Sequence, residues 1–99
     1  MSKREIVVEK LESKVEGWRT ELQRLEENAK TIDEASRDRY LHSIQEMQDQ
    51  VQQLEKKIGV LKNSTIDAWQ DLKKGTERAW SEFEAEARKT LKEVTGINY

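Results

Sequence analysis

Apolar residues recur at alternating intervals of three and four over the first third of the chain. This first seam consists of Val8, Leu11, Val15, Trp18, Leu22, Leu25, Ala29 and Ile32. An apolar repeat of about 3.5 residues is typical of a helix that packs along another helix. We therefore expect a long helix with a helical partner. Ser2 followed by Glu5 has the spacing of a capping box at its start.

A second seam of the same kind follows, made of Tyr40, Ile44, Met47, Val51, Leu54, Ile58 and Leu61. Eight residues separate Ile32 from Tyr40, one more than a heptad allows. The chain therefore either continues as one helix with a slip in the repeat or turns near residues 31–36. The capping-box spacing of Thr31 and Glu34 favours a turn, whereas the absence of glycine and proline favours continuity. We favour the continuous helix.

The apolar period changes to eleven residues in the last third of the chain. Written in elevens from residue 65, the sequence aligns large apolar residues in one strip, which contains Trp69, Leu72, Trp80, Phe83 and Leu91. Eleven residues make about three helical turns, so the strip runs nearly straight along one face of a helix. Gly96 is expected to end this helix in a left-handed conformation, with Ile97 packing back toward Leu91.

The segment between the second seam and this strip is poor in helix formers. Asn63, Ser64 and Thr65 stand in a row, and Asp67 follows Ser64 at capping distance. We therefore place the main chain reversal near residues 63–65, with a second break near 31–36 as the alternative. The predicted fold is all-α: an elongated antiparallel helical hairpin or coiled coil of two or three long amphipathic helices, forming a single coiled-coil domain over residues 1–99.

The large apolar residues of the two seams and the strip are the expected packing and interface residues. Two helices of unequal length cannot cover all these residues within one chain, so we expect a homo-oligomer, most simply a homodimer. If both breaks occur, three segments of similar length close a three-helix bundle as a monomer. Gly75 lies beside the strip, where it leaves a hollow for a partner's large side chain. Gly17 and Gly59 fall on outer positions, where neither has an evident role.

The composition argues against chemistry at a site. The chain has no cysteine and one histidine, and 18 basic residues face 20 acidic ones without a concentrated basic run, so nucleic-acid binding is not expected. His42 has Asp38 and Glu46 one helical turn away on either side, but two neighbours do not make a metal site. No catalytic or phosphate-binding motif occurs. We expect a non-enzymatic protein with no catalytic residue, cofactor or metal.

Binding to a membrane surface is the alternative function. An amphipathic helix with Trp69, Trp80 and Phe83 on one face has the pattern of a lipid-binding helix. Basic and acidic residues are nearly balanced over residues 64–99, so attraction to anionic lipid should be slight and this alternative is not favoured. The apolar run Ile6 to Val8 is far too short for a signal-peptide core or a membrane span, so a cytoplasmic protein is expected.

Three segments carry a resemblance to a known family: VEKLESKVEGWRTELQRLE, YLHSIQEMQDQVQQLEKKIGVLKN and DAWQDLKKGTERAWSEFEAEARKTL. Their layout resembles that of small bacterial coiled-coil proteins described as stress-response or uncharacterised proteins, over nearly the whole chain. The AW...LKxG...AW...F pattern is the most distinctive part, and the central segment departs from the family in lacking its alanine-rich character. The resemblance implies a cytoplasmic, non-enzymatic helical protein useful under stress, with no molecular activity to assign to particular residues.

Overall fold

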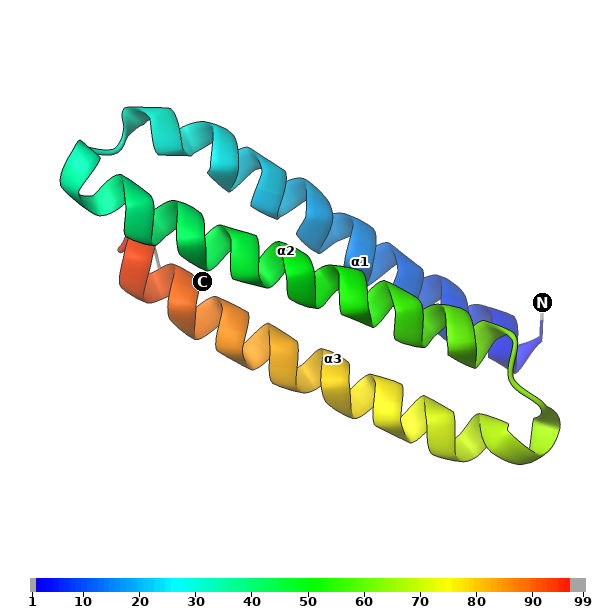
Figure 1. Cartoon of the computed structure of the whole chain (residues 1–99). Coiled ribbons are helices and arrows are strands. Elements are labelled where there is room, and N and C mark those ends of the chain that lie inside the picture. Colours follow the sequence, from blue (N-terminus) through cyan, green and yellow to red (C-terminus); the bar gives the residue numbers. More distant parts are fainter. Residues whose placement is uncertain (1, 97–99) are drawn as a thin grey trace.

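The computed structural model describes residues 2–96, which form an antiparallel bundle of three long helices (Figure 1). Helix α1 spans Lys3–Asn28, a short 3-10 helix η1 spans Ala29–Thr31, α2 spans Glu34–Lys62 and α3 spans Ile66–Thr95. The described chain measures 51 × 21 × 20 Å, so the molecule is a rod. The predicted all-α antiparallel architecture is confirmed, in its three-helix form.

The continuous helix expected through residues 31–36 is wrong, because α1 ends at Asn28 and the chain turns back before α2. The turn satisfies its own backbone groups. Arg37 donates from Nε to the carbonyl oxygen of Ala29 at 3.1 Å and from Nη2 to that of Ile32 at 2.8 Å. Carbonyl groups at a helix end lack intrahelical partners, so these bonds stabilise the break. The reversal also lets the two seams pack against each other, which a continuous helix would prevent.

The second reversal lies where the sequence predicts it, between Lys62 and Ile66. The side chain of Ser64 donates to the carbonyl oxygen of Leu61 at 2.7 Å. Arg4 of α1 reaches this turn: its Nη2 donates to the Ser64 carbonyl oxygen at 2.8 Å, and its guanidinium lies 4.5 Å from the ring centroid of Trp69. A guanidinium over an indole face is attractive. The start of α1 is therefore tied to the α2–α3 turn.

Each long helix begins at a side-chain oxygen that accepts a backbone N–H, an arrangement that stabilises a helix by about 1 kcal/mol. The capping residue of α1 is the predicted one. The caps of the other two helices differ from the predicted ones: Asp33 lies two residues after Thr31, and Thr65 lies one residue after Ser64. The caps are Ser2, which accepts from the Glu5 N–H at 3.2 Å, Asp33, which accepts from Ser36 at 3.2 Å, and Thr65, which accepts from Ala68 at 3.3 Å.

Gly96 ends α3 as predicted. Its φ of 73° places it in the left-handed region that favours glycine, and its N–H donates to the Lys92 carbonyl oxygen at 3.0 Å. Ile97, expected to pack back toward Leu91, lies outside the described residues.

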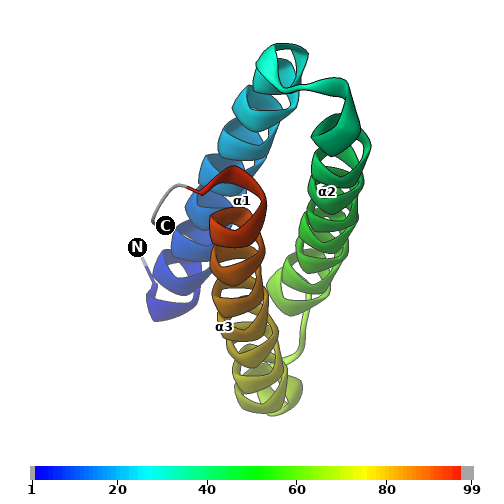
Figure 2. The same cartoon turned by 90° about the vertical axis from the view of Figure 1, so that its left-hand side faces the viewer.

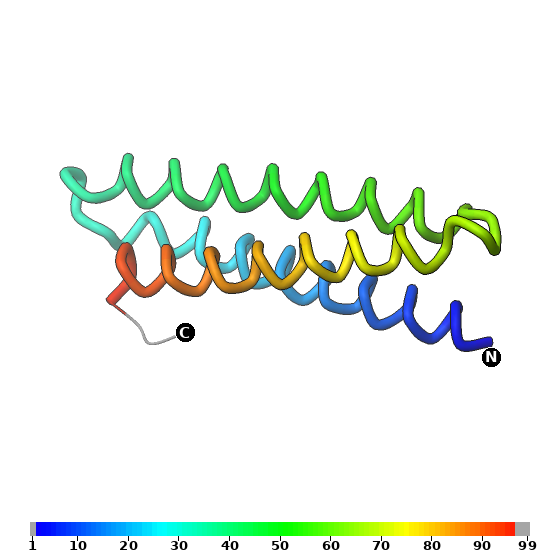
Figure 3. Tube along the Cα trace, turned by 90° about the horizontal axis from the view of Figure 1, so that it is seen from below, coloured from blue at the N-terminus to red at the C-terminus, as the bar shows by residue number. Residues whose placement is uncertain are grey.

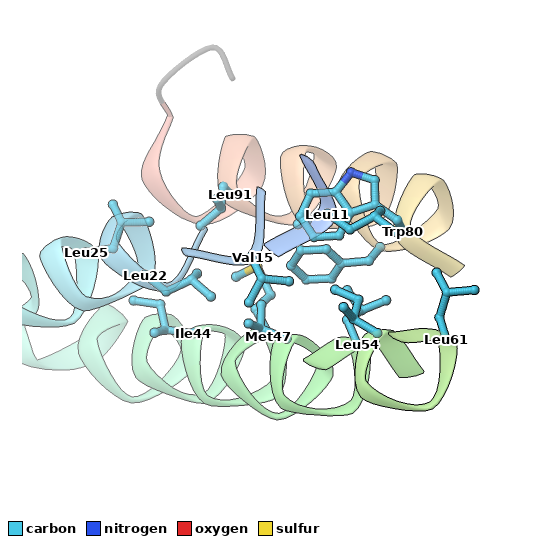
Figure 4. Close-up of a cluster of buried hydrophobic side chains, with 14 of the residues drawn as sticks. Leu11, Val15, Leu22, Leu25, Ile44, Met47, Leu54, Leu61, Trp80 and Leu91 are labelled. Carbon is cyan, nitrogen blue, oxygen red and sulfur yellow. The ribbon is translucent and has the colours of Figure 1, made fainter. Parts of the chain in front are cut away.

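The three helices lie alongside one another along the rod (Figures 2 and 3), and their buried apolar residues form one core. Within residues 2–96, α2 packs closely against both neighbours, whereas no Cα of α1 lies within 8 Å of a Cα of α3. The core side chains from all three helices meet between them (Figure 4). Because the backbones of α1 and α3 lie farther apart, only long or large side chains can make contact between these two helices.

Candidate interaction surfaces

All the expected packing residues lie in or against the core of a single chain. Those that are buried are Val8, Leu11, Val15, Leu22, Leu25, Ile44, Met47, Val51, Leu54, Ile58, Leu61, Trp69, Trp80, Phe83 and Leu91, and those that are partly buried are Trp18, Ile32 and Leu72. One chain thus covers its own stripes. The homodimer therefore stays a prediction, and it needs a surface other than these stripes.

Aromatic side chains span the wide gap between α1 and α3. The rings of Trp18 and Phe83 meet edge to face, with centroids 5.3 Å apart and planes at 74°. Trp80 of the same helix also packs against Phe83, with ring centroids 5.7 Å apart. Edge-on ring pairs are favourable beyond the area that they bury. The Trp18–Phe83 contact therefore joins two helices whose backbones stay apart.

The same separation leaves a groove of about 590 Å³ along the α1/α3 side of the bundle. We call it the α1/α3 groove. Gly17 lies in it, and a Cβ atom built there would have nothing within 4 Å, so the groove is open at this position. This gives Gly17 a structural context that the sequence did not provide. The lining residues are Lys14, Gly17, Trp18, Glu21, Trp80, Glu84 and Arg88.

A smaller recess of about 330 Å³ lies between α2 and α3 around Gly75. We call it the Gly75 hollow. A Cβ at Gly75 would have nothing within 4 Å, and Leu72 and Thr76 line the α3 side. Val60 lines the α2 side and is 58% exposed, although it is a large apolar residue. The expected hollow beside the strip is therefore present, and the sequence pattern had not singled out Val60 beside it.

The α1/α2 side is polar by contrast. Arg19 forms an ion pair with Glu55 across the two helices, and Gln48 donates from Nε2 to Glu26 Oε2 at 2.8 Å. These polar contacts join α1 and α2 across this side of the bundle.

Tyr40 is a buried titratable group near the start of α2. It is 3% exposed, and its hydroxyl donates to the Leu25 carbonyl oxygen at 2.8 Å. Burial disfavours the phenolate and raises the pKa of Tyr40 above 10.0, while Arg24 lowers it and Glu21 raises it by smaller amounts. The neutral hydroxyl is therefore a fixed link between the end of α1 and the start of α2.

Replacing Tyr40 with phenylalanine is expected to lower the free energy of unfolding by about 1–2 kcal/mol, because a buried carbonyl loses its donor. A raised pKa in the folded state means that the unfolded chain releases the Tyr40 proton first as pH rises. The contribution of Tyr40 to the free energy of unfolding should be fully present below about pH 10. It should fall above pH 10, as the pH rises toward the folded-state pKa. Urea unfolding at increasing pH checks both effects. A Tyr40→Phe variant that loses stability as steeply as the native protein above pH 10 would contradict the assignment to Tyr40.

No cluster of side chains suited to binding a metal ion occurs among the described residues. His42 Nε2 lies 3.0 Å from Glu46 Oε1, and both side chains are largely exposed. Within residues 2–96 no three histidine, cysteine or acidic side chains are grouped as a metal would require. The same part of the chain holds no helix with the length and apolar composition needed to cross a bilayer.

No protein-family model, curated protein or solved structure matches this chain.

Proposed function

We propose that this chain is a non-enzymatic helical interaction module whose partner is a second copy of itself. The observation that carries the proposal is the pairing of exposed Val60 with the Gly75 hollow in one patch. A two-fold axis brings the same patch of both copies together, so each contact is made twice. Val60 of each copy can then enter the Gly75 hollow of the other, which buries an apolar side chain that the single chain leaves in water.

The charges around the hollow are also self-complementary. Lys56 and Lys57 border it on α2 and Asp71 borders it on α3. Across the described residues, no ion pair involves any of these three side chains. In a two-fold dimer, Asp71 of each copy approaches the lysines of the other. Charges at the rim of an interface favour the correct partner and faster association more than they add affinity.

The membrane alternative draws less support from the bundle. Trp69, Trp80 and Phe83, which would contact lipid, are each less than 10% exposed. Lipid contact through them would require the bundle to open and lose its core packing. The stress-linked role and the cytoplasmic location that the family resemblance implies stay part of the proposal, as the setting in which self-association would act.

Substituting Gly75 with leucine tests the dimer. Leucine fills the hollow, so we expect the association constant to fall at least about tenfold, the equivalent of ~1.4 kcal/mol. The same change should stabilise each subunit by about 0.5–1 kcal/mol, because glycine inside a helix is unfavourable and no atom obstructs the new side chain. Sedimentation equilibrium over a range of concentrations measures the first effect and urea unfolding the second.

Gly59→Leu is the matched control. Gly59 also lies inside a helix with nothing within 4 Å of a Cβ, and it does not line the Gly75 hollow. This variant should gain similar subunit stability and keep the native association constant. A native protein that stays monomeric at every concentration, or a Gly75→Leu variant that associates as well as Gly59→Leu, would overturn the proposal.

A further inference from the structure

The indole N–H of Trp80 is a buried donor without an acceptor. Trp80 is 3% exposed, and its Nε1 has no hydrogen-bond partner among the described residues. Figure 4 shows this nitrogen on the side of the ring that faces away from α2. Trp80 also lines the α1/α3 groove. Buried tryptophan N–H groups usually have a partner, so an unpaired one beside a groove indicates a place for an external acceptor.

A cation lies over the ring that carries this donor. The ammonium of Lys14 is 5.7 Å from the centroid of the Trp80 ring, and no ion pair of the described residues includes Lys14. Lys14 is exposed on α1, so its flexible side chain can move when an acceptor approaches the indole N–H. A donor and an unpaired positive charge together favour an anionic acceptor.

The acidic residues of the groove already have basic partners. Glu84 pairs with Arg88 at 2.8 Å, and Glu21 pairs with Arg24 at 2.5 Å. Lys14 thus supplies the one lining charge that is left for a ligand. The two nearby carboxylates still repel a strongly charged group, so a single negative charge suits this groove better than a phosphate.

The rest of the groove is apolar and open. Trp18 and Trp80 contribute indole surface, and Gly17 leaves the space between the two helices clear. The volume of about 590 Å³ lies within the range of small-molecule sites, ~300–1,000 Å³. Such a groove can hold a short aliphatic chain or a single ring beside the indoles.

We propose that the α1/α3 groove binds a small apolar carboxylate, free in solution. The carboxylate accepts a hydrogen bond from Trp80 Nε1 and pairs with the Lys14 ammonium, and the apolar body lies along Trp18 and Gly17. This site is on the α1/α3 side of the rod, separate from the α2/α3 patch, and it does not depend on self-association.

Octanoate is the first probe. The control compounds 1-octanol and octylamine share its aliphatic chain but lack its negative charge. The three indole N–H resonances, assigned in the native protein by NMR, report where each probe binds. Octanoate should shift the Trp80 indole resonance saturably and downfield, as a new hydrogen bond does. Octanol should bind at least about tenfold more weakly, because it lacks the charge that faces Lys14.

Two variants locate the site. Gly17→Leu fills the groove without obstruction and should weaken octanoate binding at least about tenfold, whereas Gly59→Leu, with the same change elsewhere, should bind like the native protein. Lys14→Gln should weaken it about tenfold, and Lys89→Gln, which removes the same charge from an exposed position outside the groove, should not. Urea unfolding of each variant verifies that the fold is kept.

Phosphatidylcholine vesicles with and without oleate separate the two sources of such a carboxylate. A shift of the Trp80 resonance by octanoate without vesicles supports a ligand free in solution. A shift of the Trp80 resonance only with oleate-containing vesicles would overturn the proposal that the carboxylate is bound from free solution. Octanol binding as tightly as octanoate, unchanged affinity in Gly17→Leu, or no shift at Trp80 would overturn the site itself.

Discussion

Replacing Phe83 with alanine should lower the free energy of unfolding by about 3–5 kcal/mol, the largest effect that we expect from a single side chain. Phe83 is 6% exposed and contacts the rings of both Trp18 and Trp80. It also lines a recess between α2 and α3 together with Leu54 of α2. Because the backbones of α1 and α3 stay apart, removal of this ring deletes the main link between them along with its own buried area. Urea unfolding followed by circular dichroism measures the loss.

Phe83→Leu separates the ring contacts from the apolar volume. Leucine keeps most of the buried surface and loses the edge-on pairing, so we expect a loss of about 1–2 kcal/mol. Both variants should be compared at one protein concentration, since self-association raises apparent stability. A Phe83→Leu variant as stable as the native protein would show that the ring does not bridge the helices. A Phe83→Ala variant that loses no more stability than Phe83→Leu would contradict the contribution of the buried apolar volume.

Replacing Leu91 with alanine is expected to lower the free energy of unfolding by about 3 kcal/mol. Leu91 is completely buried near the end of α3, in the same core as Leu22 of α1 and Ile44 of α2 (Figure 4). The cavity left by the missing carbons cannot close fully, because the surrounding helices are fixed at their turns. Thermal and urea unfolding check the size of the loss.

Ile66→Ala is the control on the same helix. Ile66 is 85% exposed at the first position of α3, so its truncation should change stability by no more than about 0.5 kcal/mol. Equal losses in Leu91→Ala and Ile66→Ala would contradict the core described above.

The seams predict the helices well because an apolar repeat follows directly from helix geometry. The eight-residue step from Ile32 to Tyr40 was harder to interpret, since a slip and a turn both preserve the pattern on either side. Asp33 and Arg37 favour the turn over the slip because their side chains form hydrogen bonds with backbone groups at the break. Neither residue stands out by its spacing in the sequence. A turn is thus set by a few polar contacts worth about 1 kcal/mol each, which a pattern of apolar residues does not contain.

The surfaces were predictable only in part. Gly75 lies beside the apolar strip in the sequence, and the hollow predicted there is present. The α1/α3 groove depends on how far apart two helices lie, which is a property of the packed bundle and not of either helix alone. Gly17 therefore had no evident purpose in the sequence, although it keeps that groove open. The unpaired N–H of Trp80 likewise exists only once the neighbouring helices are in place.

The odd number of long helices has a mechanical consequence. α1 starts at one end of the bundle and α3 finishes at the other, as the trace in Figure 3 shows. Polypeptide or cargo attached at the two ends of this folded region would thus be held apart by nearly the full 51 Å of the rod, so that the bundle would act as a stiff spacer. An even number of helices would instead bring both attachment points to the same end.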